Sequence, residues 1–334
     1  MLKQVIALDP IHFAGLKKRG ETVFPNFDEP LILSVELNTY CGLNCIFCKN
    51  NSIQKAMNDA IFEKLIEHIY KSNNLTTLAI SGGEPFLDDR LERLLSVCRE
   101  RKVPTSIDTN CNWDEIPETI SKCGQIRIKL LSLKEDTHNI LVGRKNYRKV
   151  IRFINWLTQN FSGSKVIFFP IIRQNLYEID HVVNFALDKG FYCNFFPYPR
   201  GFISKPALSR EEYKFFMNKL SLIFKRHPKN VFIDLPLLGL REKSLINICP
   251  AIFISSHIDV DGYLKICKFC SKKIGSLENL SLRSLWTNQK NTIKRFNIIC
   301  SNCNFYLNCG GGCFVNKDKS GVDHYCPIYR NGGV

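Results

Sequence analysis

Three cysteines stand within eight residues near the start of the chain, at Cys41, Cys45 and Cys48. Thiolates this close together in sequence are expected to bind one shared centre. A tetrahedral structural zinc site needs four ligands, and no fourth cysteine or histidine lies nearby. The spacing therefore favours an ion or an iron–sulfur cluster with one open position, where a substrate or cosubstrate can bind. A zinc site or a redox-inert cysteine loop is the alternative.

A second candidate feature is a glycine-rich turn made of Ser81, Gly82, Gly83, Glu84 and Pro85. Two adjacent glycines let the backbone approach a ligand closely. A glutamate carboxylate accepts hydrogen bonds from an ammonium group. Taken in isolation, these residues are more simply interpreted as an ordinary turn after a buried strand.

Cysteines gather again in the last third of the chain. They are Cys249, Cys267, Cys270, Cys300, Cys303, Cys309, Cys313 and Cys326. The segments Phe253–Asp259 and Tyr263–Cys267 flank Val260-Asp261-Gly262, a pattern that predicts a β-hairpin. A short segment with little apolar core of its own can be folded by metal centres. The alternative is a ribbon-like tail with two zinc sites.

Composition and the absence of targeting features indicate the compartment in which we expect the protein. The chain has 334 residues and 15 cysteines, and its start lacks the apolar region and cleavage site of a signal peptide. No apolar run is long enough to span a bilayer. Because a reducing cytosol keeps thiols free, the clustered cysteines predict metal or cluster ligands rather than disulfides, and we expect a cytoplasmic protein without a membrane partner.

The net charge of +15 would by itself suggest a nucleic-acid partner. Thiolates bound to clusters would lower that charge, and no motif of interleaved basic and aromatic residues is present. We therefore expect no nucleic-acid partner. A basic surface also suits the docking of a small acidic electron carrier of the flavodoxin or ferredoxin type.

Strands and helices are predicted to alternate along the first two thirds of the chain. The predicted strands are Leu31–Asn38, Leu75–Ile80, Pro104–Asp108, Gln125–Leu133, Lys165–Ile172 and Tyr192–Phe196. The predicted helices are Asn58–Tyr70, Asp89–Arg101, Ile116–Cys123, Asn146–Asn160, Glu178–Lys189 and Ser209–Arg226. Alternation requires parallel strands with right-handed crossovers, which form an open doubly wound α/β sheet or a partial barrel.

The candidate residues follow successive predicted strands. The cysteine motif follows the first strand, the glycine-rich turn follows the second, and Thr109-Asn110-Cys111 follows the third. Ligands of both α/β architectures bind at the carboxyl ends of the strands. We therefore expect these three segments to form one site.

The C-x3-C-x2-C spacing, followed by this turn, resembles the radical SAM enzymes. By that resemblance the three cysteines hold a [4Fe–4S] cluster whose open iron binds S-adenosylmethionine (SAM), in a partial (β/α)6 barrel. The turn resembles the GGEP motif that holds the methionyl amine of SAM. Thr109 and Asn110 stand in place of the family's TNG turn, with Cys111 replacing its glycine. Lys129 and Ser132 could contact the SAM ribose or carboxylate; a surface lysine and a turn serine are the alternative.

The later cysteines resemble the SPASM extension of the same superfamily, which carries two auxiliary [4Fe–4S] clusters. By that resemblance one auxiliary cluster takes Cys249, Cys267 and Cys313, and the other takes Cys300, Cys303, Cys309 and Cys326. Cys270 could complete the first cluster, which otherwise has an open iron. Sulfatase-maturing relatives carry an aspartate base after the hairpin cysteine, where this chain has Lys268, so sulfatase maturation is not expected.

These observations divide the chain into four parts. We expect an N-terminal extension over 1–30, a radical SAM barrel over 31–227, a linker over 228–248 and a small iron–sulfur domain over 249–334. Three [4Fe–4S] clusters and SAM are the expected cofactors.

The resemblance implies that SAM is cleaved reductively to a 5′-deoxyadenosyl radical, which abstracts a hydrogen atom from the substrate. The leading hypothesis is crosslinking, oxidation or epimerisation of a ribosomal peptide or protein. A radical dehydrogenase or epimerase of a sugar, aminocyclitol or cofactor precursor is the second hypothesis, and a non-enzymatic iron–sulfur or zinc module is the third. Cys111 and Cys193, at or near strand ends, are candidate hydrogen donors, although core packing is the simpler role for both.

Overall fold

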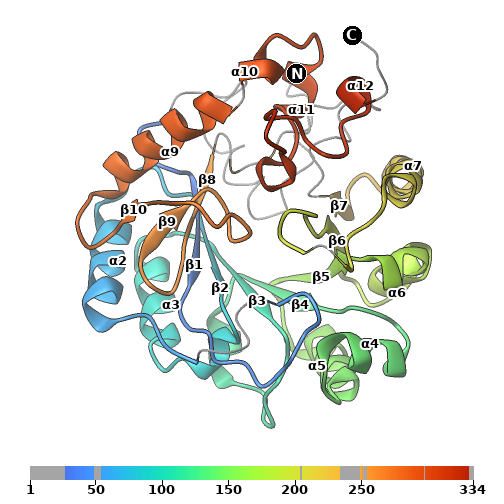
Figure 1. The fold of residues 1–334 in the computed structure, drawn as a ribbon. Helices are drawn as coiled ribbons and strands as arrows, with labels where there is room; N and C mark the ends of the chain where they lie inside the picture. Colours follow the sequence, from blue (N-terminus) through green and yellow to red (C-terminus); the bar gives the residue numbers. More distant parts are fainter. Residues whose placement is uncertain are drawn as a thin grey trace.

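The computed structural model describes residues 27–48, 54–203, 205–233, 249, 251, 254–296 and 298–330. Its centre is one ten-stranded sheet in the order β10-β9-β8-β1-β2-β3-β4-β5-β6-β7. Figure 1 shows this sheet curving around the middle of the molecule, with helices on its outer face. The predicted N-terminal extension lies outside the described residues, except for residues 27–30.

All six predicted parallel strands are present. They are β1 (Ile32–Glu36), β2 (Thr77–Ser81), β3 (Thr105–Thr109), β4 (Gln125–Lys129), β5 (Ser164–Ile171) and β6 (Tyr192–Pro197), each parallel to its neighbour. A seventh strand, β7 (Val231–Ile233), adds to β6 in parallel. The predicted α/β fold with a curved parallel sheet is thereby confirmed.

Side chains alternate between the two faces of the strands, as the period of two requires. In β4, Ile126 and Ile128 are fully buried in the main hydrophobic core, whereas Arg127 and Lys129 are half-buried. Strand β1 repeats this pattern, with Val35 in the core and Glu36 half-buried. One face of the sheet is therefore apolar and the other carries charged groups.

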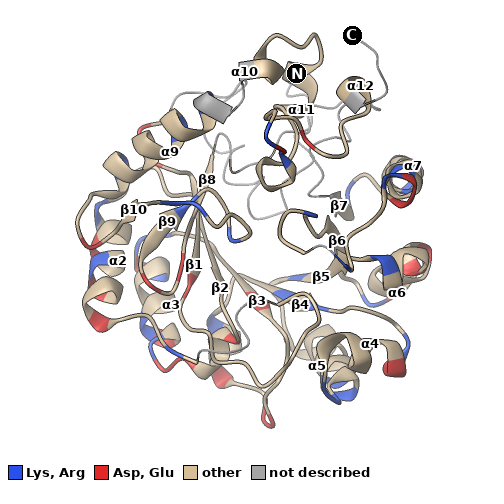
Figure 2. Ribbon diagram, in the orientation of Figure 1, with Lys and Arg blue, Asp and Glu red and all other residues tan. Residues whose placement is uncertain are grey.

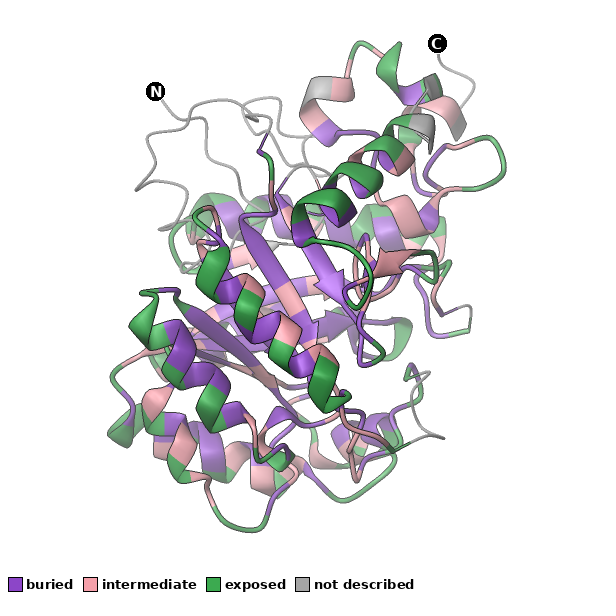
Figure 3. Cartoon of the chain, turned by 90° about the vertical axis from the view of Figure 1, so that its left-hand side faces the viewer, coloured by how far each residue is buried: buried purple, intermediate pink, exposed green. Residues whose placement is uncertain are grey.

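Helices pack on the apolar face of the sheet. They are α2 (Asp59–Lys71), α3 (Leu91–Glu100), α4 (Glu135–Val142), α5 (Tyr147–Asn160), α6 (Ile179–Asp188) and α7 (Arg210–Arg226). Figure 3 shows that the helices on the side of α2 and α3 have exposed outer surfaces and that the strands behind them are buried. The predicted helix at 116–123 is instead the 3-10 helix η2 (Glu118–Lys122), and α4 was not predicted.

The predicted hairpin near the C-terminus joins the main sheet. Its strands are β8 (Ser255–Ile258) and β9 (Tyr263–Lys265), and a further strand, β10 (Lys273–Ser276), pairs with β9. Strand β8 lies parallel to β1, with Ile258 beside Val35. The first part of the segment predicted as a separate domain therefore continues the barrel's sheet.

The end of the chain packs on this barrel through a few close contacts. The ring of Tyr325 stacks on Tyr213 of α7 with a centroid distance of 3.9 Å, and its hydroxyl donates to the Leu208 carbonyl at 2.7 Å. Helix α9 (Leu282–Phe296) buries Trp286, whose Nε1 donates to the Phe27 carbonyl at 2.9 Å. The short elements α10 (Ile298–Ser301), α11 (Tyr306–Cys309), η5 (Phe314–Asn316) and α12 (Pro327–Arg330) complete the chain. The cysteine-rich segment is thus held against the barrel.

No helix in the described parts of the chain is long and apolar enough to cross a membrane.

Candidate active site

A cavity of about 260 Å³ lies at the carboxyl ends of the parallel strands. Glu36 ends β1, Gly82 and Gly83 follow β2, Asn110 follows β3, and Lys129 ends β4. Cys41, Cys45, Cys48 and Cys270 also line it, together with Thr39, Leu43, Phe47, Gln54, Tyr198, Phe202, Lys265, Lys268, Phe269 and Ser271. The sequence motifs that were expected to meet therefore lie around one cavity.

The cysteine loop is held in place by a helix that the sequence did not predict. The backbone N–H of Asn44 donates to the Val142 carbonyl at 2.9 Å, and that of Ile46 donates to the Leu141 carbonyl at 3.1 Å. Both acceptors lie in the last turn of α4, whose free carbonyls need partners. Gly143 ends this helix at φ +68, where an added Cβ would lie 2.5 Å from the Asn44 carbonyl oxygen. The loop and helix thus require a glycine at their contact.

The thiols of the loop differ in exposure. Cys45 is buried, Cys41 is partly exposed and Cys48 is exposed. Burial raises the pKa of Cys45 to about 12, against the opposing effect of the Lys129 ammonium. Burial lowers the pKa of Lys129, but the nearby thiols of Cys45, Cys41 and Cys48 outweigh this effect and raise it overall. Because thiolates are the metal-binding form, loading this site releases protons.

The glycine-rich turn approaches the cysteine loop through its backbone. The N–H of Gly83 donates to the Asn38 carbonyl at 2.9 Å, and the N–H of Glu84 donates to the Tyr40 carbonyl at 2.7 Å. A Cβ on Gly83 would lie 2.2 Å from the Tyr40 carbonyl oxygen. Gly82 and Gly83 line the cavity, whereas Ser81 and Pro85 do not.

Glu84 occupies a different place from the one predicted. Its side chain is fully buried outside the cavity lining. One carboxylate oxygen accepts hydrogen bonds from the Asn110 N–H at 2.9 Å and from the Thr109 hydroxyl at 2.9 Å. The carboxylate therefore fixes the turn after β3, and the predicted contact of this side chain with the SAM amine is not supported.

Asn110 is the residue of that turn that reaches the site. Its Nδ2 donates to the Cys41 sulfur at 3.2 Å and to the Gly83 carbonyl at 3.0 Å. Cys111, the next residue, has φ +60, a left-handed conformation that suits the glycine it replaces. The three strand ends are thus joined by direct hydrogen bonds.

Three other predicted site residues lie away from the cavity. The Ser132 hydroxyl donates to Glu178 Oε1 at 2.7 Å, which commits it to a structural contact. Cys111 and Cys193 are buried among the apolar residues of the main core. Because neither thiol lines the cavity, these placements favour core packing, the simpler role, over hydrogen donation.

Several cavity residues were not predicted from the sequence. Glu36, Lys265 and Lys268 bring charge to the lining, and burial lowers the pKa of Lys268. Tyr198 stacks on Phe47 of the cysteine loop with a centroid distance of 4.5 Å. The alternation of side chains along β1 and β9 was the available signal for Glu36 and Lys265. The sequence alone did not show which face of these strands points into the cavity.

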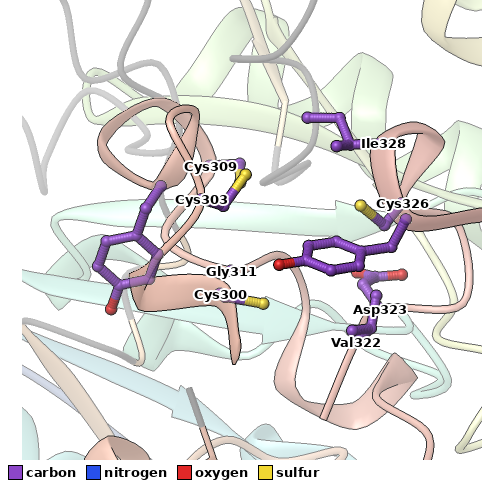
Figure 4. Close-up of a pocket in the computed structure, with 10 residues that line it drawn as sticks. Cys300, Cys303, Cys309, Gly311, Val322, Asp323, Cys326 and Ile328 are labelled. Carbon is purple, nitrogen blue, oxygen red and sulfur yellow. The ribbon is translucent and has the colours of Figure 1, made fainter. Parts of the chain in front are cut away.

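A second, smaller cavity contains the thiols of Cys300, Cys303, Cys309 and Cys326 (Figure 4). This is the grouping that the resemblance implied. Lys317 Nζ lies 3.7 Å from the Cys300 sulfur, and the buried Asp323 carboxylate accepts from the Cys313 N–H at 2.7 Å. Four thiols around one space form a donor set that suits an iron–sulfur cluster.

The remaining cysteines form a third group. Cys313 lies close enough to Cys249 and Cys267 for their charges to interact, and burial raises the pKa of Cys313 well above its usual value. Cys270 packs with Cys249 and Cys267 in a small apolar cluster and also lines the main cavity. It therefore lies between the two sites.

The donor chemistry of the main cavity fits a cluster with an open position. Its thiols come from a single loop, and the glycine backbone and Asn110 leave space beside them. Among the described residues, no group of three or more His, Cys, Asp or Glu side chains is arranged to hold a single metal ion. The three thiols and the open space beside them fit the cluster that the sequence pattern indicated.

Comparison with known families decides the identity of the barrel. A model described as "Radical SAM superfamily" matches residues 35–186, from β1 through most of α6. Residues 35–186 therefore form a radical SAM domain. A [4Fe–4S] cluster and SAM are accordingly its cofactors.

Three curated relatives of this radical SAM chain differ in how much they share with it. The cysteine-type anaerobic sulfatase-maturating enzyme of Clostridium novyi is 25% identical over 84% of this chain and 86% of its own length. The sporulation killing factor maturation protein SkfB of Bacillus subtilis is 21% identical over 74% of this chain and 62% of its own. A probable GTP 3′,8-cyclase of Thermoplasma volcanium is 25% identical over 48% of this chain, which spans about half (51%) of that cyclase.

Solved structures with this fold also cover the C-terminal part. SuiB of Streptococcus suis bound to S-adenosylmethionine matches with a TM-score of 0.71 and 20% identity, over 95% of this chain and 80% of SuiB. The enzyme anSMEcpe with bound AdoMet matches with a TM-score of 0.70 and 19% identity, over 90% of this chain and 95% of that enzyme. The fold of this chain, including its C-terminal part, is therefore the fold of SuiB and anSMEcpe.

Substitution of Gly83 by alanine should weaken SAM binding. The added methyl group would overlap the Tyr40 carbonyl and push the turn away from the cysteine loop. We expect the dissociation constant for SAM to rise at least about tenfold, measured by equilibrium dialysis on anaerobically reconstituted protein. Gly190→Ala is the control, since Gly190 has φ +73 but open space around an added Cβ. Equal effects of the two variants on SAM binding would contradict this role of Gly83.

Glu84 should make stability depend on pH. Burial raises its pKa to about 7, although hydrogen bonds from Asn110 and Thr109 favour the charged form. Its contribution is therefore fully present below the usual value of 4.5 and is lost as pH rises through about 7. Compared with Glu84→Gln, the unfolding free energy of the unsubstituted protein should rise by about 1 kcal/mol more between about pH 8 and about pH 6. Urea unfolding followed by circular dichroism measures this difference, and identical pH dependences would refute the assignment.

Proposed function

We propose that this chain is a radical SAM enzyme that modifies a ribosomal peptide or protein by crosslinking, oxidation or epimerisation. The observation that carries the proposal is the meeting of Cys41, Cys45 and Cys48 with Gly82, Gly83 and Asn110 around one cavity. When bound, the [4Fe–4S] cluster and SAM supply a reducing electron and a 5′-deoxyadenosyl radical that abstracts a substrate hydrogen atom. The chain's own residues bind, orient and shield the reactants.

Each part of the cavity has a distinct task in this proposal. Cys41, Cys45 and Cys48 would hold the cluster, and Asn110 would orient the Cys41 sulfur through its Nδ2 hydrogen bond. The backbone of Gly82 and Gly83 would border SAM, and the Lys129 ammonium would balance the negative charge of the thiolates. Tyr198, Phe47, Phe202 and Phe269 form an aromatic part of the lining, which would exclude water from a reactive radical.

The C-terminal cysteines would hold two auxiliary [4Fe–4S] clusters, in the domain predicted over 249–334. Support comes from the cavity that Cys300, Cys303, Cys309 and Cys326 share, and from the proximity of Cys249 and Cys267 to Cys313. Cys270 is the candidate fourth ligand of the latter group, since it packs in the same apolar cluster. An acidic flavodoxin or ferredoxin would deliver electrons to the basic surface of the chain.

A peptide substrate is favoured over a small molecule by the extent of the alignments. The maturation enzymes align with 84% and 74% of this chain, whereas the cyclase aligns with 48%. SuiB has been solved with the precursor peptide SuiA, and anSMEcpe with the Cp18Cys peptide. A radical dehydrogenase or epimerase of a small molecule is the alternative function.

The assignment of the cysteines to three clusters predicts how much iron and how much activity remain when the cysteine loop is substituted. Reconstituted protein should hold about twelve irons per chain and produce 5′-deoxyadenosine from SAM and dithionite. The triple variant Cys41→Ala/Cys45→Ala/Cys48→Ala should keep about eight irons and lose this product completely. Cys98→Ala, a buried cysteine of α3 outside every cysteine group described above, is the matched control and should keep both.

Two results would overturn this assignment. Zinc in place of iron would favour the non-enzymatic binding module. No 5′-deoxyadenosine from fully iron-loaded protein would exclude radical SAM activity.

A further inference from the structure

The main cavity carries more positive than negative side chains. Lys129, Lys265 and Lys268 line it, and Glu36 is the carboxylate among the lining residues. Figure 2 shows basic residues on β4 and around β9, the two elements that bring these lysines to the cavity. The proposed function assigns a task only to Lys129. The charge of Lys265 and Lys268 therefore needs its own explanation.

Asp108 is the carboxylate nearest to Lys268, but Arg127 already pairs with it. Arg127 Nε lies 3.1 Å from Asp108 Oδ1, and its guanidinium also stacks over the Phe168 ring at 4.6 Å. Lys268 Nζ lies 3.8 Å from Asp108 Oδ2, beyond hydrogen-bond distance. The Asp108 carboxylate thus lies near two cations and is closer to Arg127 than to Lys268.

The other charged groups near the cavity do not offset this excess of positive side chains. His257 Nε2 lies 3.6 Å from Glu36 Oε1, and both Lys268 and Lys265 interact with the Glu36 carboxylate electrostatically. Lys129 interacts most strongly with the thiols of the cysteine loop. Among the described residues, Glu36 and Asp108 are the carboxylates near Arg127, Lys265 and Lys268. Lys265 also interacts with the thiols of Cys267 and Cys270. The cavity lining therefore carries more ammonium groups than carboxylates beside the reaction centre.

Building on the proposed function, we propose that the peptide substrate enters this cavity carboxylate first, and that Lys265 and Lys268 bind that carboxylate. Charge-assisted hydrogen bonds from two ammonium groups are strong where bulk water is excluded. Tyr198, Phe202 and Phe269 would contact the apolar part of the same residue. The carboxylate belongs either to an aspartate or glutamate side chain or to the C-terminus of the peptide.

The position of the two lysines separates this role from binding of SAM, which also carries a carboxylate. Lys265 ends β9, and Lys268 lies in the turn that follows, next to Cys267. The cysteine loop and the glycine-rich turn, where SAM is expected, follow β1 and β2 instead. A substitution at Lys268 should therefore change peptide binding more than SAM binding.

The test uses three N-acetylated hexapeptide libraries that differ only in one carboxylate. The first has a fixed central glutamate and an amidated C-terminus, the second has glutamine in its place, and the third has glutamine and a free C-terminal carboxylate. Dissociation constants are measured by equilibrium dialysis against reconstituted holoprotein with SAM. The proteins are the unsubstituted chain, Lys268→Met, Lys265→Met and the control Lys229→Met, an exposed lysine before β7.

We expect one carboxylate library to bind the unsubstituted protein at least about tenfold more tightly than the neutral library. Preference for the first library identifies a side-chain carboxylate, and preference for the third identifies the C-terminus. Lys268→Met and Lys265→Met should each reduce this preference, while Lys229→Met should retain it.

Equal binding of all libraries would overturn the inference, as would an unchanged preference in Lys268→Met or a loss of SAM affinity equal to the loss of peptide affinity. The proposed function is judged separately by 5′-deoxyadenosine formation in the unsubstituted protein without peptide. Absence of 5′-deoxyadenosine would refute radical SAM activity. The peptide dissociation constants would still show whether Lys265 and Lys268 bind a carboxylate.

Discussion

The site depends on three backbone turns being held within hydrogen-bond distance of one another. The Gly83 and Glu84 N–H groups bind the carbonyls that precede the cysteine loop, and the buried Glu84 carboxylate binds the Asn110 N–H. Asn110 in turn links the turn after β3 to the cysteine loop by donating a hydrogen bond to the Cys41 sulfur. Because parallel strands end at one edge of the sheet, these few bonds convert three separate sequence motifs into one cavity.

This arrangement divides the work between the two faces of the sheet. The apolar face, with residues such as Val35 and Ile128, packs on the helices and forms part of the main hydrophobic core. The other face gives up apolar burial and carries Glu36, Asp108, Arg127 and Lys129 instead. Charged groups are tolerated there because they are paired with each other or with the ligands of the site. Stability and chemistry are therefore provided by alternate residues of the same strands.

Local patterns predicted the six parallel strands and most of the helices that pack on them, although not α4, since periodicity depends on neighbours in the sequence. They could not predict that β8 lies beside β1, because that pairing joins residues more than two hundred positions apart. The same limit hid Lys268, which reaches the cavity only because its hairpin continues the barrel's sheet. Glu84 illustrates a different limit: the motif showed that a carboxylate was needed, but only the hydrogen bonds showed that it serves the backbone.

The central proposal is that SAM binds directly to an iron held by the cysteine loop. Electron–nuclear double resonance on the reduced protein, with SAM labelled by ¹⁷O in its carboxylate and by ¹⁵N in its amine, reports that contact. We expect couplings from both labels that disappear in the Cys41→Ala/Cys45→Ala/Cys48→Ala variant. Fully loaded clusters with no coupling to either label would contradict it.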